Sequence, residues 1–159
     1  MCIRDRNFSQ TGCHQIDWET DCSGNPFPEG FYVTSDAYDC IGVTITNNHA
    51  FPVVLFNSSA PTGGDTDLGT PSSNCPSCTG SCPGQSNDPN GGLTNCVDQG
   101  LVMITEENPI DVAPADGLED DPDDHFESDY TFCFDAPVTI STLDSVSYTH
   151  LTLPTTPYV

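Results

Sequence analysis

The sequence has almost no basic side chains: Lys and Arg together number 2, against 24 Asp and Glu, which gives a formal net charge of −22 at pH 7. Both basic residues are arginines, Arg4 and Arg6. Nucleic acids and anionic membrane surfaces bind through cationic side chains, so this composition disfavours them as partners. Because the carboxylates lack salt-bridge partners, their charge must be offset by water, by backbone N–H groups or by bound cations.

Long apolar runs and catalytic motifs are missing too. No stretch approaches the roughly 20 apolar residues that cross a bilayer, so we expect no direct membrane insertion. There is no Gly-x-Ser-x-Gly elbow, no His-Glu-x-x-His helix and no phosphate-binding loop. His14, His49 and His125 fall in separate turns, where we expect them to be solvated. We therefore predict a protein that is not an enzyme; a glycosidase with carboxylates spread over loops is an alternative.

Both ends of the chain resemble a translated sequencing-library adapter. Residues 1–5 back-translate as ATG-TGT-ATA-AGA-GAC, and the reverse complement of that DNA encodes Val-Ser-Tyr-Thr-His, which is residues 146–150. We exclude residues 1–6 and 145–159 as adapter artefacts. Residues 7–144 are then one domain, interpreted as a fragment open at both ends, with 23 of the 24 acidic residues and no Lys or Arg.

Cysteines are plentiful in this domain, and their even number favours disulfides in an oxidising compartment, outside the cell or on its surface. The eight are Cys13, Cys22, Cys40, Cys75, Cys78, Cys82, Cys96 and Cys133. We expect the four between Cys75 and Cys96 to pair among themselves, and Cys13–Cys22 and Cys40–Cys133 as weaker candidates. A zinc cluster at Cys75, Cys78, Cys82 and Cys96 is the alternative, which would need reduced thiolates.

Short apolar or alternating runs between Gly, Pro and Asp turns predict an all-β fold, a β-sandwich or jelly roll, incomplete at its C-terminus. Residues 72–100, rich in Ser, Pro, Gly and Cys, are expected to form an inserted loop. The predicted strands lie at 16–18, 30–34, 41–46, 51–57, 101–105, 129–135 and 138–143. Tyr130, Phe132 and Phe134 should share one face of their strand.

Residues 61–71, Pro-Thr-Gly-Gly-Asp-Thr-Asp-Leu-Gly-Thr-Pro, follow the apolar strand 51–57. Two aspartates at alternate positions of a tight turn are suited to Ca²⁺, which takes six to eight oxygen ligands. If the strands from Val53 and Leu101 run in the same direction, their C-terminal ends bring further carboxylates together. The predicted ligands are Asp65, Asp67, Glu106, Glu107, Asp121, Asp123 and Asp124. A solvated acidic rim, or adaptation to salt, is the alternative.

Three motifs carry a resemblance: residues 56–71, the strand and acidic pair of residues 101–107, and Asp121-Pro-Asp-Asp124 before an aromatic strand. Together they are similar to a recurrent β-sandwich module of secreted and cell-surface proteins of marine microbes, like jelly-roll carbohydrate-binding modules. The resemblance covers about residues 31–144, and the Cys-rich insertion departs from it. It implies an extracellular binding or adhesion role toward a glycan or a cell-surface or matrix partner. A structural acidic envelope protein without a specific ligand is the alternative.

Aromatic side chains offer one more candidate surface. Trp18, Tyr32, Tyr38 and Phe51 are able to form a platform on which sugar rings stack, but ordinary core packing is the favoured explanation for them.

Overall fold

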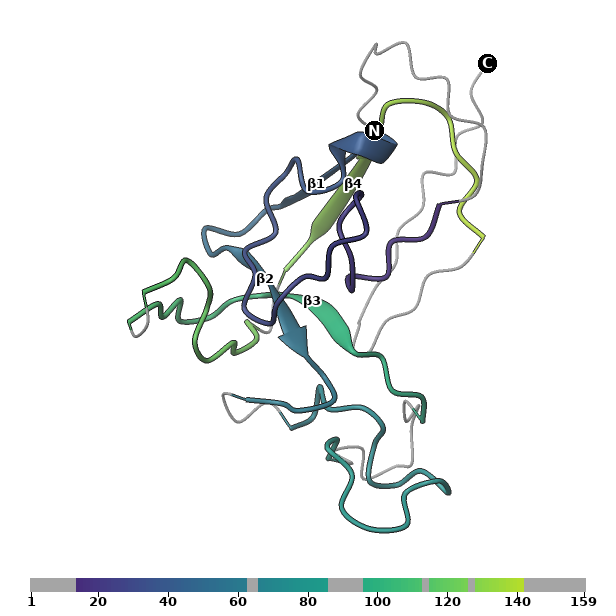
Figure 1. Cartoon of the computed structure of the whole chain (residues 1–159), viewed down its shortest axis with the longest axis vertical. Helices are drawn as coiled ribbons and strands as arrows, with labels where there is room; N and C mark the ends of the chain where they lie inside the picture. The colour runs from purple at the N-terminus through teal and green to yellow at the C-terminus, as the bar shows by residue number, and fades with distance from the viewer. Residues whose placement is uncertain (1–13, 63–65, 86–95, 113–114, 126–127, 142–159) are drawn as a thin grey trace.

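The computed structural model describes residues 14–62, 66–85, 96–112, 115–125 and 128–141, and within them the fold is all-β (Figure 1). One 3-10 turn, η1 (Asp39–Ile41), is the single helical element among these residues, and no helix there is long and apolar enough to cross a membrane. The strands are β1 (Val43–Asn47), β2 (Val53–Asn57), β3 (Leu101–Thr105) and β4 (Tyr130–Phe134). They form two antiparallel pairs, β1 with β4 and β2 with β3.

Of the two strand pairs, β2–β3 is the more deeply buried. Val53 stands opposite Thr105 and Asn57 opposite Leu101. All four residues of β2 before Asn57 are buried, as expected for a strand that is apolar on both faces. One face contributes to a first core cluster that consists of Val54, Phe56, Leu68 and Ile104, with Tyr32 and Val102 packed against it.

Residues 30–33 run along the other edge of β2, where the sequence predicts a strand. The N–H of Gly30 donates to the carbonyl of Leu55 at 2.8 Å, and that of Val33 donates to Val53 at 2.8 Å. Gly30 has a φ of 74°, which favours glycine, and a Cβ there would collide with the backbone of Glu119. Gly30 therefore joins this edge to the acidic segment that follows β3, by which we mean residues 106–125.

The β1–β4 pair contributes to a second core cluster, built around Tyr38, Val43 and Ile45. Phe132 and Phe134 of β4 both pack against it, as the alternation of that strand predicts. Met103 of β3 reaches the same cluster and so connects the two strand pairs.

Most of the candidate aromatic side chains pack into the two core clusters. The Trp18 and Tyr38 rings meet edge to face with centroids 5.6 Å apart, and Tyr32 packs on the first cluster. These contacts favour core packing over a sugar platform for the three of them.

Three predicted strands do not form, and one of them, at residues 30–34, is reduced to isolated bridges of Tyr32 with Val54 and of Phe31 with Leu118. Ile16 and Trp18 pack into the second cluster from a loop, and the φ of 63° at Trp18 is incompatible with a strand. Residues 138–141 have no strand partner among the described residues, and Val138 and Ile140 are 54% and 53% exposed. Residues 142–143 of that prediction lie outside the described residues.

The disulfides are Cys22–Cys40, Cys75–Cys96 and Cys78–Cys82 among the described residues, and Cys133 is disulfide-bonded as well. The cysteines between 75 and 96 pair among themselves as predicted, so the zinc hypothesis is wrong, because no thiolate remains to ligate. The predicted Cys13–Cys22 and Cys40–Cys133 pairs are also wrong, since Cys22 pairs with Cys40; Cys13 itself lies outside the described residues. Three disulfides indicate an oxidising environment.

Candidate functional site

The acidic segment after β3 is organised by a buried carboxylate, Glu106. Its side chain is fully buried, and each oxygen accepts a backbone N–H: Oε1 from Asn108 at 2.9 Å and Oε2 from Asp123 at 3.1 Å. The N–H of Glu107 also donates to the carbonyl of Asp123, at 2.8 Å, so residues 123–125 pair with the end of β3. Glu106 faces inward and Glu107 outward, as expected for neighbours on an extended chain.

A second buried carboxylate, Glu119, has no counterpart among the sequence predictions. Its side chain is 3% exposed. Oε2 accepts the hydroxyl of Tyr32 at 2.8 Å and the N–H of Ile110 at 2.6 Å, and Oε1 accepts the N–H of Asp121 at 3.3 Å. In the sequence Glu119 stands among other acidic residues, so no local pattern distinguishes it from them.

Burial changes the acidity of these groups. Desolvation raises the pKa of Glu106, the hydrogen bonds from the backbone N–H groups of Asn108 and Asp123 oppose that rise, and the charge of Glu119 adds to it. Burial, followed by the hydrogen bond to Glu119, raises the pKa of Tyr32 to about 12. Tyr32 therefore stays a neutral hydrogen-bond donor to Glu119 at physiological pH.

The segment that carries Asp67 reaches the acidic segment by a different route from the one predicted. β2 and β3 are antiparallel, so the expectation that they run in the same direction is wrong, and their C-terminal ends lie at opposite ends of the pair. The chain instead folds back after β2. The hydroxyls of Ser58 and Thr70 are 2.6 Å apart and buried, and Leu68 inserts into the first core cluster. This return places the loop against the acidic segment, where Thr62 Oγ1 donates to the carbonyl of Pro122 at 3.5 Å.

Asp124 is the carboxyl on which charges from the other acidic groups act. Its carboxyl is half-buried, and its pKa is raised by burial first and then by the charges of Asp67, Asp123 and Glu107, whereas His125 lowers it. These carboxylates come from all three acidic groups that the sequence singles out. Asp65, the other aspartate of the 61–71 loop, lies outside the described residues.

The carboxylates do not form a preformed metal cage. Within the described ranges, no three His, Cys, Asp or Glu side chains lie close enough together to hold a metal ion. Glu106 is committed to two backbone N–H groups, and Asp121 is exposed. The described residues thus show an acidic face whose charges act on one another.

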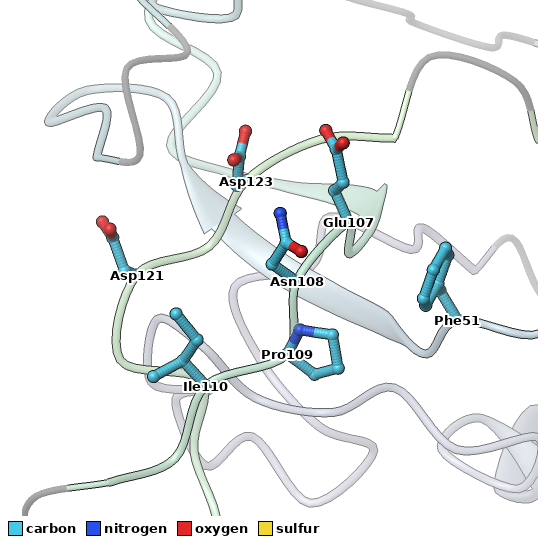
Figure 2. Close-up of a pocket in the computed structure, with 7 residues that line it drawn as sticks. All are labelled: Phe51, Glu107, Asn108, Pro109, Ile110, Asp121 and Asp123. Carbon is cyan, nitrogen blue, oxygen red and sulfur yellow. The ribbon is translucent and has the colours of Figure 1, made fainter.

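An open depression of about 560 Å³ lies on this face (Figure 2). It is lined by Phe51, Glu107, Asn108, Pro109, Ile110, Asp121 and Asp123. Figure 2 shows the carboxylates of Glu107 and Asp123 extending in the same direction, with Asn108 between them. The lining thus combines carboxylates with apolar side chains.

Two histidines contact Phe51, one of the residues that line the depression. The rings of His49 and His125 have centroids 4.1 Å apart, and His49 stacks on Phe51 at 4.9 Å. His49 Nδ1 accepts the N–H of Phe51 at 3.4 Å. The sequence places the two histidines in separate turns and expects both to be solvated, but the fold brings their half-buried rings into contact.

A comparison of the chain with protein-family models, with curated proteins and with solved structures finds no match. The functional argument therefore depends on the acidic face.

Proposed function

We propose that the protein is a non-catalytic extracellular module of the β-sandwich or jelly-roll type that binds Ca²⁺ on its acidic face. The observation that carries the proposal is the environment of Asp124, a half-buried carboxyl on which three further carboxylates act. The described residues contain no Lys or Arg to compensate them. A divalent cation removes this repulsion, and hard oxygen ligands are what Ca²⁺ prefers.

The proposed ligands are the carboxylates of Asp67, Asp123, Asp124 and Glu107, with Asp121 as a further candidate. Asp65, which the sequence also predicts as a ligand, lies outside the described residues. Glu106 is left out because both of its oxygens already accept backbone N–H groups. Since no cage of three ligands is preformed among the described residues, binding requires the loop that carries Asp67, and the carboxylate side chains themselves, to move toward the ion. Such movement costs ordering free energy, so we expect the weak affinity of extracellular modules, a Kd of about 10⁻⁴ to 10⁻³ M.

Calorimetric titration of the 159-residue chain with CaCl₂ tests this proposal, together with melting curves in EDTA and in CaCl₂. If the Kd is about 0.3 mM, Ca²⁺ at about 5 mM should stabilise the folded state by about 1.7 kcal/mol. Asp124→Asn should weaken binding about tenfold. Asp36→Asn removes an exposed charge from another turn and should leave binding unchanged. The proposal fails if no heat and no melting shift appear at millimolar Ca²⁺.

The partner class that we propose is a glycan or a cell-surface or matrix component, bound by loops that Ca²⁺ has made rigid. Ordering a loop before the partner arrives lowers the cost of binding it. Screening against a glycan array with and without EDTA separates this role from the alternative of an acidic structural protein. Binding that depends on Ca²⁺ supports the module, whereas unchanged melting and no bound glycan support the structural alternative.

A further inference from the structure

The depression beside the carboxylates has a backbone that is held in place from within the protein. Four of its seven lining residues donate their N–H to a buried carboxylate: Asn108 and Asp123 to Glu106, and Ile110 and Asp121 to Glu119. Burial of the two glutamates protects these bonds from water. The lining is therefore arranged before any ligand arrives, which lowers the ordering cost of binding.

The side chains of the depression divide into two chemical kinds. Phe51, Pro109 and Ile110 supply apolar surface, and Ile110 is 39% exposed. Glu107, Asp121 and Asp123 supply negative charge, and the described residues offer no Lys or Arg to neutralise it. Figure 2 shows Asn108 between the two carboxylates that extend together, those of Glu107 and Asp123, and the side chains of Pro109 and Ile110. An occupant that fills the depression must therefore match an apolar surface at one side and a pair of negative charges at the other.

An arginine side chain combines an apolar stem with a positively charged head, and so it meets both requirements. Its methylene stem covers apolar surface while its guanidinium head stays at a polar edge. The planar head donates hydrogen bonds to carboxylates in a fixed geometry and also packs on aromatic rings, which a lysine ammonium does less well. We propose that the depression is a docking site for an arginine side chain of a partner polypeptide, with its stem on Pro109 and Ile110 and its head at Glu107 and Asp123.

This proposal does not rest on the Ca²⁺ proposal, although Glu107 and Asp123 belong to both. The arginine site requires no metal, and a Ca²⁺ ion on the shared carboxylates would compete with the guanidinium. Binding measured in EDTA therefore tests the arginine site alone. Loss of peptide affinity on addition of Ca²⁺ tests the overlap separately, so the two proposals fail independently.

The probe is an acetylated tetra-arginine amide, titrated calorimetrically into the full chain in EDTA at low salt, with tetra-citrulline and tetra-lysine peptides as references. Tetra-citrulline keeps the shape of arginine without its charge and should not bind. Tetra-lysine should bind about threefold to tenfold more weakly than tetra-arginine. Amide chemical-shift changes should centre on residues 107–110 and 121–123.

Variants separate a site from general attraction between a polyanion and a polycation. Glu107→Gln with Asp123→Asn should weaken tetra-arginine binding about tenfold or more. Ile110→Ser leaves the net charge unchanged and should still weaken it about threefold to fivefold. The matched control is Asp17→Asn with Asp36→Asn, which removes two exposed charges elsewhere and should change the affinity less than about twofold.

Several results would overturn the inference. Equal losses in the site and control double variants would mean non-specific electrostatics, and an unchanged affinity in Ile110→Ser would remove the apolar part of the site. Equal binding of tetra-lysine would indicate a generic cation surface, and tighter binding of a glucosamine oligomer would indicate a site for cationic sugars. If the site double variant does not fold, Ile110→Ser and the shift mapping on the natural sequence decide the question.

Discussion

Replacing Glu106 by Ala should destabilise the protein clearly more than replacing its outward-facing neighbour Glu107. The substitution removes both acceptors of the fully buried side chain, so the N–H groups of Asn108 and Asp123 lose their partners. It also leaves a cavity between β3 and residues 123–125. One favourable effect opposes these losses, because a buried carboxylate, whose pKa is raised by desolvation, disappears.

The magnitude follows from the hydrogen bonds. A buried N–H left without a partner costs about 1–3 kcal/mol, and two of them are affected. Relief of the buried charge offsets part of this cost, so we expect a net loss of about 2–4 kcal/mol of unfolding free energy. Domains of this size have about 5–15 kcal/mol in total, so the variant should still fold but with a clearly lower midpoint.

Urea unfolding in EDTA near neutral pH measures the change, with Glu107→Ala as the matched control. Glu107 is the next residue and has the same chemistry, but its side chain points outward and lines the depression. Its removal should change stability by less than about 0.5 kcal/mol. If the two variants lose equal stability, or if Glu106→Ala loses less than about 0.5 kcal/mol, the buried carboxylate does not organise this segment.

Two further predictions concern pH and the disulfides. Burial raises the pKa of Glu106 and of Asp124 above their ordinary values of 4.5 and 3.8. As the pH falls from neutrality toward these values, the native state therefore binds more protons than the unfolded state, and stability in EDTA should rise down to about pH 4.5. A melting temperature that stays constant or falls over this range would contradict the argument. The Cys75–Cys96 disulfide spans a sequence separation of 21 residues, and Cys78–Cys82 spans one of 4. Because a disulfide that closes a longer loop removes more entropy from the unfolded chain, replacing both cysteines by Ser should cost about 3 kcal/mol for the first and about 2 kcal/mol for the second, measured by urea unfolding. A larger cost for the second disulfide would contradict this reasoning.

The strands could be predicted where the pattern of apolar residues was local. The run before Asn57 is apolar on both faces and became β2, and the alternation around Phe132 became β4. Prediction failed at Trp18 and at Val138, where apolar residues are present but no neighbouring strand pairs with them among the described residues. Strand pairing is a long-range property, and a short apolar run does not reveal whether it has a partner.

The candidate site stays a prediction in its composition, and the geometry predicted for it was wrong. Asp67, Glu107, Asp123 and Asp124 were candidates from the sequence, and the fold does bring their charges together at Asp124. The predicted route, through strands running in the same direction, was wrong. The actual route depends on Ser58, Thr70 and Leu68, whose contacts fold the loop back along β2.

The sequence by itself determined the all-β class, the disulfide chemistry and the acidic surface, because alternation, cysteine number and net charge are properties of composition and of short stretches. Tertiary structure alone decided which carboxylates are buried. Glu106 and Glu119 have the same chemistry as their exposed neighbours, yet each holds two or three donors that lie apart in the chain. Burial is set by which segments pack together, and that information is not contained in any single stretch of residues.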